Sequence, residues 1–293
     1  MNNYFCGWYF KCQSNTQTLA VIPAFHQSKE GPSASIQFIA DNHAWNIPFS
    51  YHQFFQDKNK FQIALGNNHF SKDGIKLSLH TTDCSLEGSL LFGAFSPIRY
   101  DIMGPFQYIP FLQCRHSILS MKHSVTGNIC INGMDYSFSN ANGYLEGDRG
   151  YSFPKEYAWT QCFFEGGSLV LCVADIPFGL FSFTGIISII HYHGREYRLA
   201  TYLGAKVIKI KNGELIIRQG NLTLSVKLLE QKQHPLLAPV SGAMKRTIHE
   251  SACCRASYCF KQNHHTLFSF ETTSASFEYE SVSYTHLTLP TTE

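Results

Sequence analysis

The segment Lys206–Arg218 reads KVIKIKNGELIIR, two alternating runs on either side of an Asn-Gly pair. Asn-Gly tolerates the positive φ angles of a tight two-residue turn, so this segment predicts a β-hairpin. The segment Asn128–Phe138 repeats the arrangement. Further β-rich runs follow at short spacing, and no amphipathic helical run exceeds about three turns. The chain is therefore predicted to be all-β, an antiparallel barrel or sandwich with few helices.

The length of 293 residues allows two such units, each with its own core. An eight-stranded barrel can hold one small ligand in its interior. We therefore expect two lipocalin-like barrel or sandwich halves, residues 1–142 and 143–280, joined near a Gly-rich stretch at 140–155. The final segment, 281–293 (SVSYTHLTLPTTE), is Thr-rich and without pattern, and it is interpreted as a non-native tail.

The composition excludes several classes of protein. Only 15% of residues are charged while 44% are hydrophobic, which excludes a disordered chain. The net charge is +2 and the basic residues are scattered, so nucleic acid is not expected as a partner. The chain carries 24 Phe, 15 Tyr and 3 Trp, more rings than a core strictly needs. This excess indicates an apolar cavity.

Two features bear on the compartment. The 10 cysteines form no CxxC pair, and the first residues lack the pattern of a signal peptide, so we expect free thiols and a cytoplasmic protein. The stretch Ser168–Ile190 is long and nearly uncharged, but Asp175 and Pro177 interrupt it. It is interpreted as two strands about a turn rather than as a membrane span.

The densest group of polar residues lies in Gly143–Gln161, GYLEGDRGYSFPKEYAWTQ. Glu146 and Asp148 are two positions apart, so on an extended strand both face the same side. Arg149 is adjacent and could pair with a carboxylate in bidentate fashion. The alternative interpretation is a polar turn with an ordinary solvated ion pair.

A second group lies upstream, in Tyr100–His123, where Arg115 and His116 stand among apolar residues. Polar groups in such a run are costly unless paired. They are either hydrogen-bonded parts of the core or parts of a pocket. His191 and His193 would share one face of a strand, but their place before a glycine favours a solvated turn, and no metal site is predicted. Walker, Rossmann, HExxH and GxSxG motifs are absent from the sequence.

Several segments in order resemble the tocopherol cyclase family, whose members are double lipocalin-type barrels related to carotenoid hydratases. The resemblance covers most of residues 4–280. It rests on YFCGWYFK at Tyr4–Lys11, GPFQYIPFLQCRHSILSMKH at Gly104–His123 and GYLEGDRGYSFPKEYAWTQC at Gly143–Cys162, with a weaker match at RTIHES, Arg246–Ser251. Many cyclases carry Lys-Asn-Trp where this chain has Gly147–Arg149.

The resemblance implies closure of a prenylated hydroquinone to a chroman, in which an alkene carbon is protonated and the phenol oxygen captures the cation. No cofactor is required. Such chemistry needs an acid of raised pKa, an acceptor for the phenol proton and rings around the cation. The hypothesis makes Glu146 or Asp148 the acid, tuned or oriented by Arg149. His116 would bind the phenol or accept its proton. The expected substrate-binding residues are Trp8, Arg115, Tyr151, Phe153, Trp159 and Gln161.

Two other functions stay open. A non-catalytic carrier of an isoprenoid or other amphipathic lipid would have a large cavity that no carboxylate faces. An alkene hydratase would capture the cation with water, so its product would gain the mass of one water, whereas cyclisation leaves the mass unchanged. The expected partner is an isoprenoid or a prenylated quinol. Such a substrate leaves peripheral membrane contact open, although no basic amphipathic helix supports it.

Overall fold

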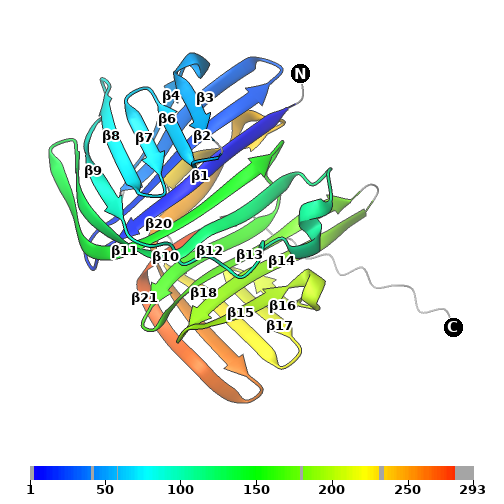
Figure 1. Cartoon of the computed structure of the whole chain (residues 1–293). Coiled ribbons are helices and arrows are strands. Elements are labelled where there is room, and N and C mark those ends of the chain that lie inside the picture. Colours follow the sequence, from blue (N-terminus) through cyan, green and yellow to red (C-terminus); the bar gives the residue numbers. More distant parts are fainter. Residues whose placement is uncertain (1–2, 41–42, 58, 179–180, 231–233, 281–293) are drawn as a thin grey trace.

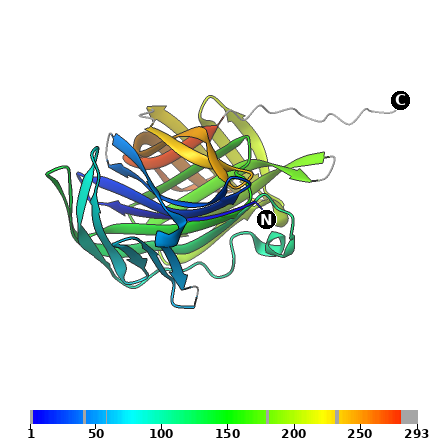
Figure 2. The same ribbon diagram turned by 90° about the horizontal axis from the view of Figure 1, so that it is seen from above.

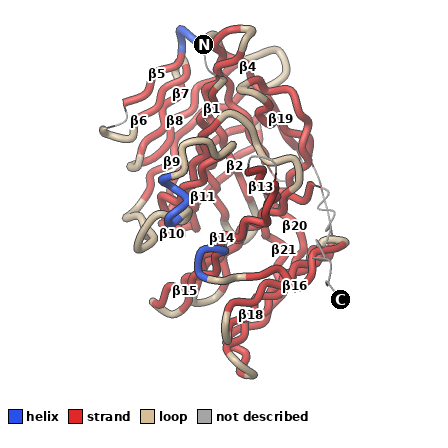
Figure 3. Tube along the Cα trace, turned by 90° about the vertical axis from the view of Figure 1, so that its right-hand side faces the viewer, coloured by secondary structure: helices blue, strands red, loops and turns tan. Residues whose placement is uncertain are grey.

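The computed structural model describes residues 3–40, 43–57, 59–178, 181–230 and 234–280. These residues form two large antiparallel sheets with three short 3-10 helices, which confirms the predicted all-β class (Figure 1). Helix is confined to a few short turns along the chain (Figure 3). The segment interpreted as a non-native tail, 281–293, lies outside the described residues.

The first sheet has the strand order β4-β3-β2-β1-β11-β10-β9-β8-β7-β6-β5. Its strands are β1 (Tyr4–Gln13), β2 (Thr18–Ser28), β3 (Gly31–Ala40), β4 (His43–Phe49), β5 (Phe54–Asp57), β6 (Gln62–Leu65), β7 (Asn68–Ser71), β8 (Gly74–His80), β9 (Ser85–Phe92), β10 (Cys114–Ile131) and β11 (Met134–Gly150). The 3-10 helices η1 (Tyr51–Gln53) and η2 (Gly104–Tyr108) lie in its connections.

The second sheet has the order β15-β14-β13-β12-β21-β20-β18-β17-β16, with β19 paired to the first part of β20. Its strands are β12 (Tyr157–Phe164), β13 (Gly167–Phe178), β14 (Phe181–Tyr192), β15 (Arg195–Ala200), β16 (Lys206–Lys211), β17 (Glu214–Gln219), β18 (Leu222–Glu230), β19 (His234–Val240), β20 (Ala243–Gln262) and β21 (His265–Glu280). The helix η3 (Thr201–Leu203) follows β15.

Local sequence signals account for the turns. Asn212 and Gly213 have φ angles of 52° and 74°, and they close the β16–β17 hairpin as predicted. The described residues of the nearly uncharged stretch Ser168–Ile190 lie in β13 and β14, which pair antiparallel and confirm the interpretation as two strands. In the part of the chain that the structure describes, no helix is long and apolar enough to cross a membrane. All ten cysteines are free thiols, as expected.

Strand alternation sends side chains to both faces of each sheet, and three separate cores result. One core lies on one face of the first sheet and includes Phe10 and Phe38. The second core lies on one face of the second sheet and includes Phe260. The third core draws residues from both sheets, among them Tyr144 and Trp159, and therefore lies between them. Strands β4–β8 and β15–β17 stand on opposite sides of the molecule in both views (Figures 1 and 2).

The two predicted halves correspond only roughly to the two sheets. The predicted boundary between residues 142 and 143 falls inside β11, and the chain passes from the first sheet to the second between Gly150 and Tyr157. Glu146 and Asp148 therefore belong to the first sheet, whereas Trp159 belongs to the second. The Gly143–Gln161 segment thus supplies side chains to both walls of the space between the sheets.

Candidate active site

A cavity of about 170 Å³ lies between the two sheets. Each sheet's own core is filled by packed side chains, so the cavity occupies the space between the halves and not the interior of a barrel, where a ligand was expected. Its wall is mostly apolar. Side chains on it include Phe5, Ile22, Met103, Phe153, Ile176 and Leu236.

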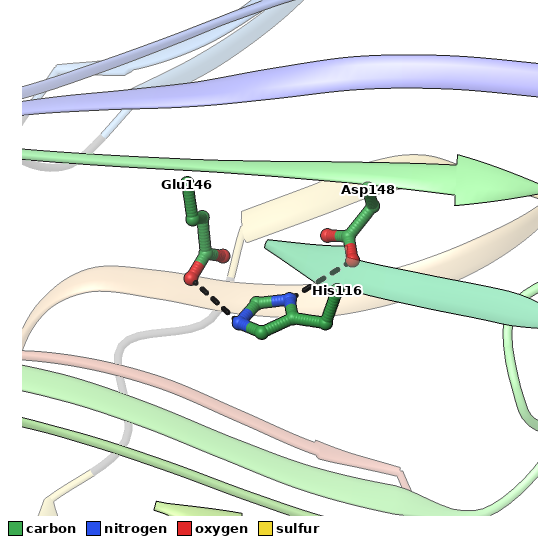
Figure 4. A group of neighbouring side chains, drawn as sticks. All are labelled: His116, Glu146 and Asp148. Carbon is green, nitrogen blue, oxygen red and sulfur yellow. Dashed lines mark hydrogen bonds and ion pairs between the residues drawn. The ribbon is translucent and has the colours of Figure 1, made fainter. Parts of the chain in front are cut away.

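Three polar side chains meet on the wall formed by β10 and β11. His116 lies directly opposite Asp148 in the strand pairing, and Ile118 lies opposite Glu146. His116 Nδ1 is 2.9 Å from Asp148 Oδ1, and its Nε2 is 3.2 Å from Glu146 Oε2 (Figure 4). Glu146 and Asp148 project from the same face of β11, as their spacing predicted. We call these three residues the histidine cluster.

The charge of the histidine cluster follows from its geometry. Burial by itself lowers the pKa of His116, but Glu146 and Asp148 together raise this pKa well above its usual value. His116 is therefore an imidazolium held between two carboxylates. Glu146 Oε2 also accepts hydrogen bonds from the Tyr144 hydroxyl and, at 3.3 Å, from Trp159 Nε1. These donors hold the Glu146 carboxylate in a fixed orientation at the cavity wall.

Two further carboxyl groups on the cavity wall were missed by the sequence analysis. Glu250 on β20 lies directly opposite Glu278 on β21, and both are buried. Tyr157 donates a hydrogen bond of 2.5 Å to Glu278 Oε2. Burial raises the pKa of both glutamates, and for Glu278 the nearby Glu250 raises it further. We call Glu250 and Glu278 the glutamate pair.

One of these two glutamates, Glu250, could have been recognised as a buried residue from the sequence. Glu250 stands between Ile248 and Ala252 on one face of β20, an acidic residue in the apolar phase of an alternating strand. Glu250 also lies in Arg246–Ser251 (RTIHES), the segment with the weaker resemblance to the cyclase family. Glu278 follows two serines on its face of β21, so no hydrophobic pattern marks it as buried.

The structure brings Trp8, Phe153 and Trp159 to the cavity together with the histidine cluster. The Trp159 ring packs edge-on against Tyr9, with centroids 5.3 Å apart. Phe153 packs edge-on against Phe5. Trp8 reaches the cavity only in part, because its side chain belongs to the core of the first sheet.

The other predicted residues lie elsewhere. Arg115 and Arg149 are directly opposite one another on the far face of β10 and β11, in a separate polar pocket of about 100 Å³. Glu146 and Asp148 instead pair with His116. Tyr151 is exposed, outside the cavity lining. Gln161 is buried and accepts a hydrogen bond of 3.0 Å from Lys11 Nζ, also away from the lining. The roles assigned to these residues remain predictions.

The histidine cluster is also the group that could hold a cation. Its three donor atoms lie within 4.8 Å of one another. The two carboxylates, however, contact opposite nitrogens of the imidazole ring, so a metal bound at either nitrogen would gain one carboxylate only. The geometry fits a bound proton better than a metal. His191, considered above as a ligand, contacts Glu196 at 3.4 Å, and Glu196 also pairs with Arg198.

Comparison with known proteins gives the fold. No family model and no curated protein matches the chain by sequence. Among solved structures, a candidate AttH of Nitrosomonas europaea is 11% identical over 96% of this chain and 93% of its own, with a TM-score of 0.55. CghA with Sch210972 is 9% identical over 95% and 88%, with a TM-score of 0.61, and CghA alone is 8% identical over 97% and 90%, with a TM-score of 0.62.

Identities this low show a shared fold and no more. The likeness extends over almost the whole of this chain, and it supports the fold that the resemblance in the sequence had implied, not its reaction. The sequence comparisons do not show the cyclase family itself. The chain therefore has the fold of AttH and CghA.

Proposed function

We propose that the protein catalyses an acid-initiated cyclisation of a prenylated quinol or a related isoprenoid in the cavity between its sheets. One observation carries the proposal: an apolar cavity has on its wall an imidazolium held between two carboxylates. A prenyl chain needs an apolar site, and a phenol that loses its proton needs an acceptor within it. The cavity combines the two.

In this reaction the histidine cluster acts at the phenol. Asp148 is the more accessible of its two carboxylates, with a side chain 22% exposed against 6% for Glu146. Asp148 therefore accepts the phenol proton as the oxygen attacks the cation, and His116 holds the Asp148 carboxylate in place. The rings of Trp159 and Phe153 shelter the positive charge. The apolar wall keeps out the water that would otherwise capture the cation.

The comparisons support a small-molecule role by analogy only. CghA, which has the same fold, was solved together with Sch210972. A carrier would use the same cavity without turnover, and a hydratase would admit water to the cation. The presence of carboxylates on the cavity wall favours catalysis over carriage.

The test is incubation of the protein with a hydroquinone that bears a prenyl chain, followed by mass spectrometry of the products. We expect an isomer of equal mass in which one phenolic hydroxyl group has become a ring ether. Asp148→Asn and Glu146→Gln should each lower the rate, by about 100-fold if the carboxylate acts as a base. His123→Gln is the matched control, because His123 is a buried histidine of β10 that packs against Phe92 outside the cavity lining.

Three results would contradict the proposal. A product heavier by one water identifies a hydratase. Retention of the unchanged quinol without any product identifies a carrier. Full turnover by both carboxylate variants removes the histidine cluster from the mechanism.

A further inference from the structure

The glutamate pair stands on the wall of the cavity that belongs to the second sheet, whereas the histidine cluster belongs to the first. Glu278 lies between Glu250 of β20 and Trp159 of β12 in a row of directly opposed residues. The indole of Trp159 in turn donates to Glu146. The two acidic groups therefore border one cavity from opposite sheets, with Trp159 between them.

Among the described residues, no cation forms a direct ion pair with the glutamate pair, and Lys11 acts on Glu250 only from a greater distance. Over the described residues, neither Glu250 nor Glu278 takes part in an ion pair. The buried Lys11 is held by the Gln161 side chain and by the carbonyl of Ser274. Two adjacent buried carboxyl groups without a direct ion pair are unfavourable when both are ionised, because each charge is poorly solvated and repels the other.

The two glutamates differ in their hydrogen bonds. Glu278 Oε2 accepts a hydrogen bond of 2.5 Å from the Tyr157 hydroxyl. Glu250 Oε1 is buried and has no hydrogen-bond partner among the residues described. Glu250 also lines the cavity, so a molecule bound there would lie beside this carboxyl group. Burial raises the pKa of Glu250 to about 7 and raises the pKa of Glu278 well above its usual value, so both carboxyl groups can hold a proton near neutral pH. Because Tyr157 already occupies one oxygen of Glu278, Glu250 is the member that we assign to proton donation.

We propose that the glutamate pair is the acid of this site: Glu250 protonates an alkene carbon of an isoprenoid bound in the cavity, while Glu278 keeps its proton and hydrogen-bonds the carboxylate left on Glu250. The assignment rests on the proposed function. It replaces Glu146 or Asp148 as the acid, because both are already paired with the imidazolium of His116.

The step balances in protons and electrons. The O–H bond of Glu250 breaks, and the alkene π pair forms a C–H bond at the less substituted carbon, which leaves a tertiary cation. A lone pair of the phenol oxygen closes the C–O bond, and the phenol proton passes to Asp148. The product is an isomer of the substrate. Asp148 then releases its proton to water and Glu250 takes one up, so the enzyme returns to its starting state without a co-reactant.

The first test needs no substrate. Infrared spectra of the whole protein near neutral pH should show the carbonyl band of a buried protonated carboxyl, and Glu250→Gln and Glu278→Gln should each change it. Glu271→Gln is the matched control, since Glu271 is an exposed residue of β21 paired with Arg255. A wild-type spectrum without such a band overturns the proposal, whatever reaction the protein catalyses.

The second test uses the prenylated hydroquinone in deuterated water. The wild-type protein should place one solvent deuteron on the former alkene carbon. Glu250→Gln should lower turnover by at least about 100-fold while substrate binding changes less than about 3-fold. Glu250→Asp, which keeps an acid, should retain part of the rate, and this separates loss of the proton from loss of folding.

The two tests separate this proposal from the proposed function. Wild-type turnover that persists in both Glu250→Gln and Glu278→Gln overturns the acid assignment and leaves the cyclase standing. No turnover by the wild-type protein, with the protonated band present, overturns the cyclase and the alkene step together. The rate should fall as the pH rises above about 7, because Glu250 then loses the proton that it must donate. The groups that act on the pKa of Glu250 are Tyr9, Lys11, Glu146 and Glu278.

Discussion

Removal of the imidazolium from the histidine cluster should destabilise the protein by a measurable amount. In His116→Gln the carboxylates of Glu146 and Asp148 lose the cation that lies between them. Removal of one partner of a buried ion pair costs about 3 to 5 kcal/mol. We expect the lower end, about 3 kcal/mol, because Asp148 is partly hydrated. For a chain of this length that is a fall in Tm of about 5 °C.

The loss should depend on pH with a defined sign. The carboxylates raise the pKa of His116 well above its usual value of 6.5, although burial alone would lower it. The stabilisation by a group of raised pKa is complete below the unfolded-state pKa and is lost as the pH rises through the folded-state pKa. The difference in unfolding free energy between wild-type protein and His116→Gln should therefore be largest at about pH 6 and shrink as the pH rises through the raised pKa of His116.

Urea denaturation followed by tryptophan fluorescence measures this difference across the pH range. His123→Gln is the control, because burial lowers the pKa of His123 to about 4 and the ring is neutral above that pH. Its cost should not vary with pH in this range. Glu146→Gln in the His116→Gln background should recover part of the lost stability. A pH-independent cost of His116→Gln, or no recovery in the double variant, would refute the ion-pair account.

Three further substitutions test single contacts by the same denaturation assay. Trp159→Phe keeps a ring but removes the N–H bonded to Glu146, and should cost about 1.5 to 3 kcal/mol. Gly150→Ala would place a Cβ 2.0 Å from the carbonyl oxygen of Gln113, and should cost about 1 to 3 kcal/mol. Burial lowers the pKa of Lys11 to about 8, so the charged amine costs stability at lower pH, and Lys11→Met should raise the unfolding free energy near pH 7 by about 1 kcal/mol after loss of its hydrogen bonds. Unchanged stability in any of them would contradict the contact it tests.

The features that sequence predicted are those set by neighbouring residues. Asn-Gly turns and two-residue alternation are local, so the hairpins and the shared face of Glu146 and Asp148 could be predicted. The same alternation sends Arg149 to the face opposite Asp148, where the structure places it. The idea of an Arg149 pair with a neighbouring carboxylate required a turn at this point, and β11 instead continues extended to Gly150.

The contacts that make the site depend on strand register, which the sequence alone does not specify. His116 is opposite Asp148 only because β10 and β11 pair in one register, and irregularities follow beyond Ile118. Glu250 and Glu278 meet through the pairing of β20 with β21, whose register also shifts along its length. A displacement of one residue in either pairing would send these side chains to the other face.

The separation of acidic groups between two sheets has a chemical consequence. Cyclisation consumes one proton at carbon and releases one at oxygen, so a single group that served both steps would have to reach both ends of the new ring. In the proposed reaction, Glu250 on the second sheet donates the proton to carbon and Asp148 on the first sheet accepts the proton from oxygen. Buried glutamates without a direct ion pair hold a proton, whereas Asp148, oriented by the imidazolium, presents acceptor oxygens. The cavity between the sheets is the place where these opposite environments face the same molecule.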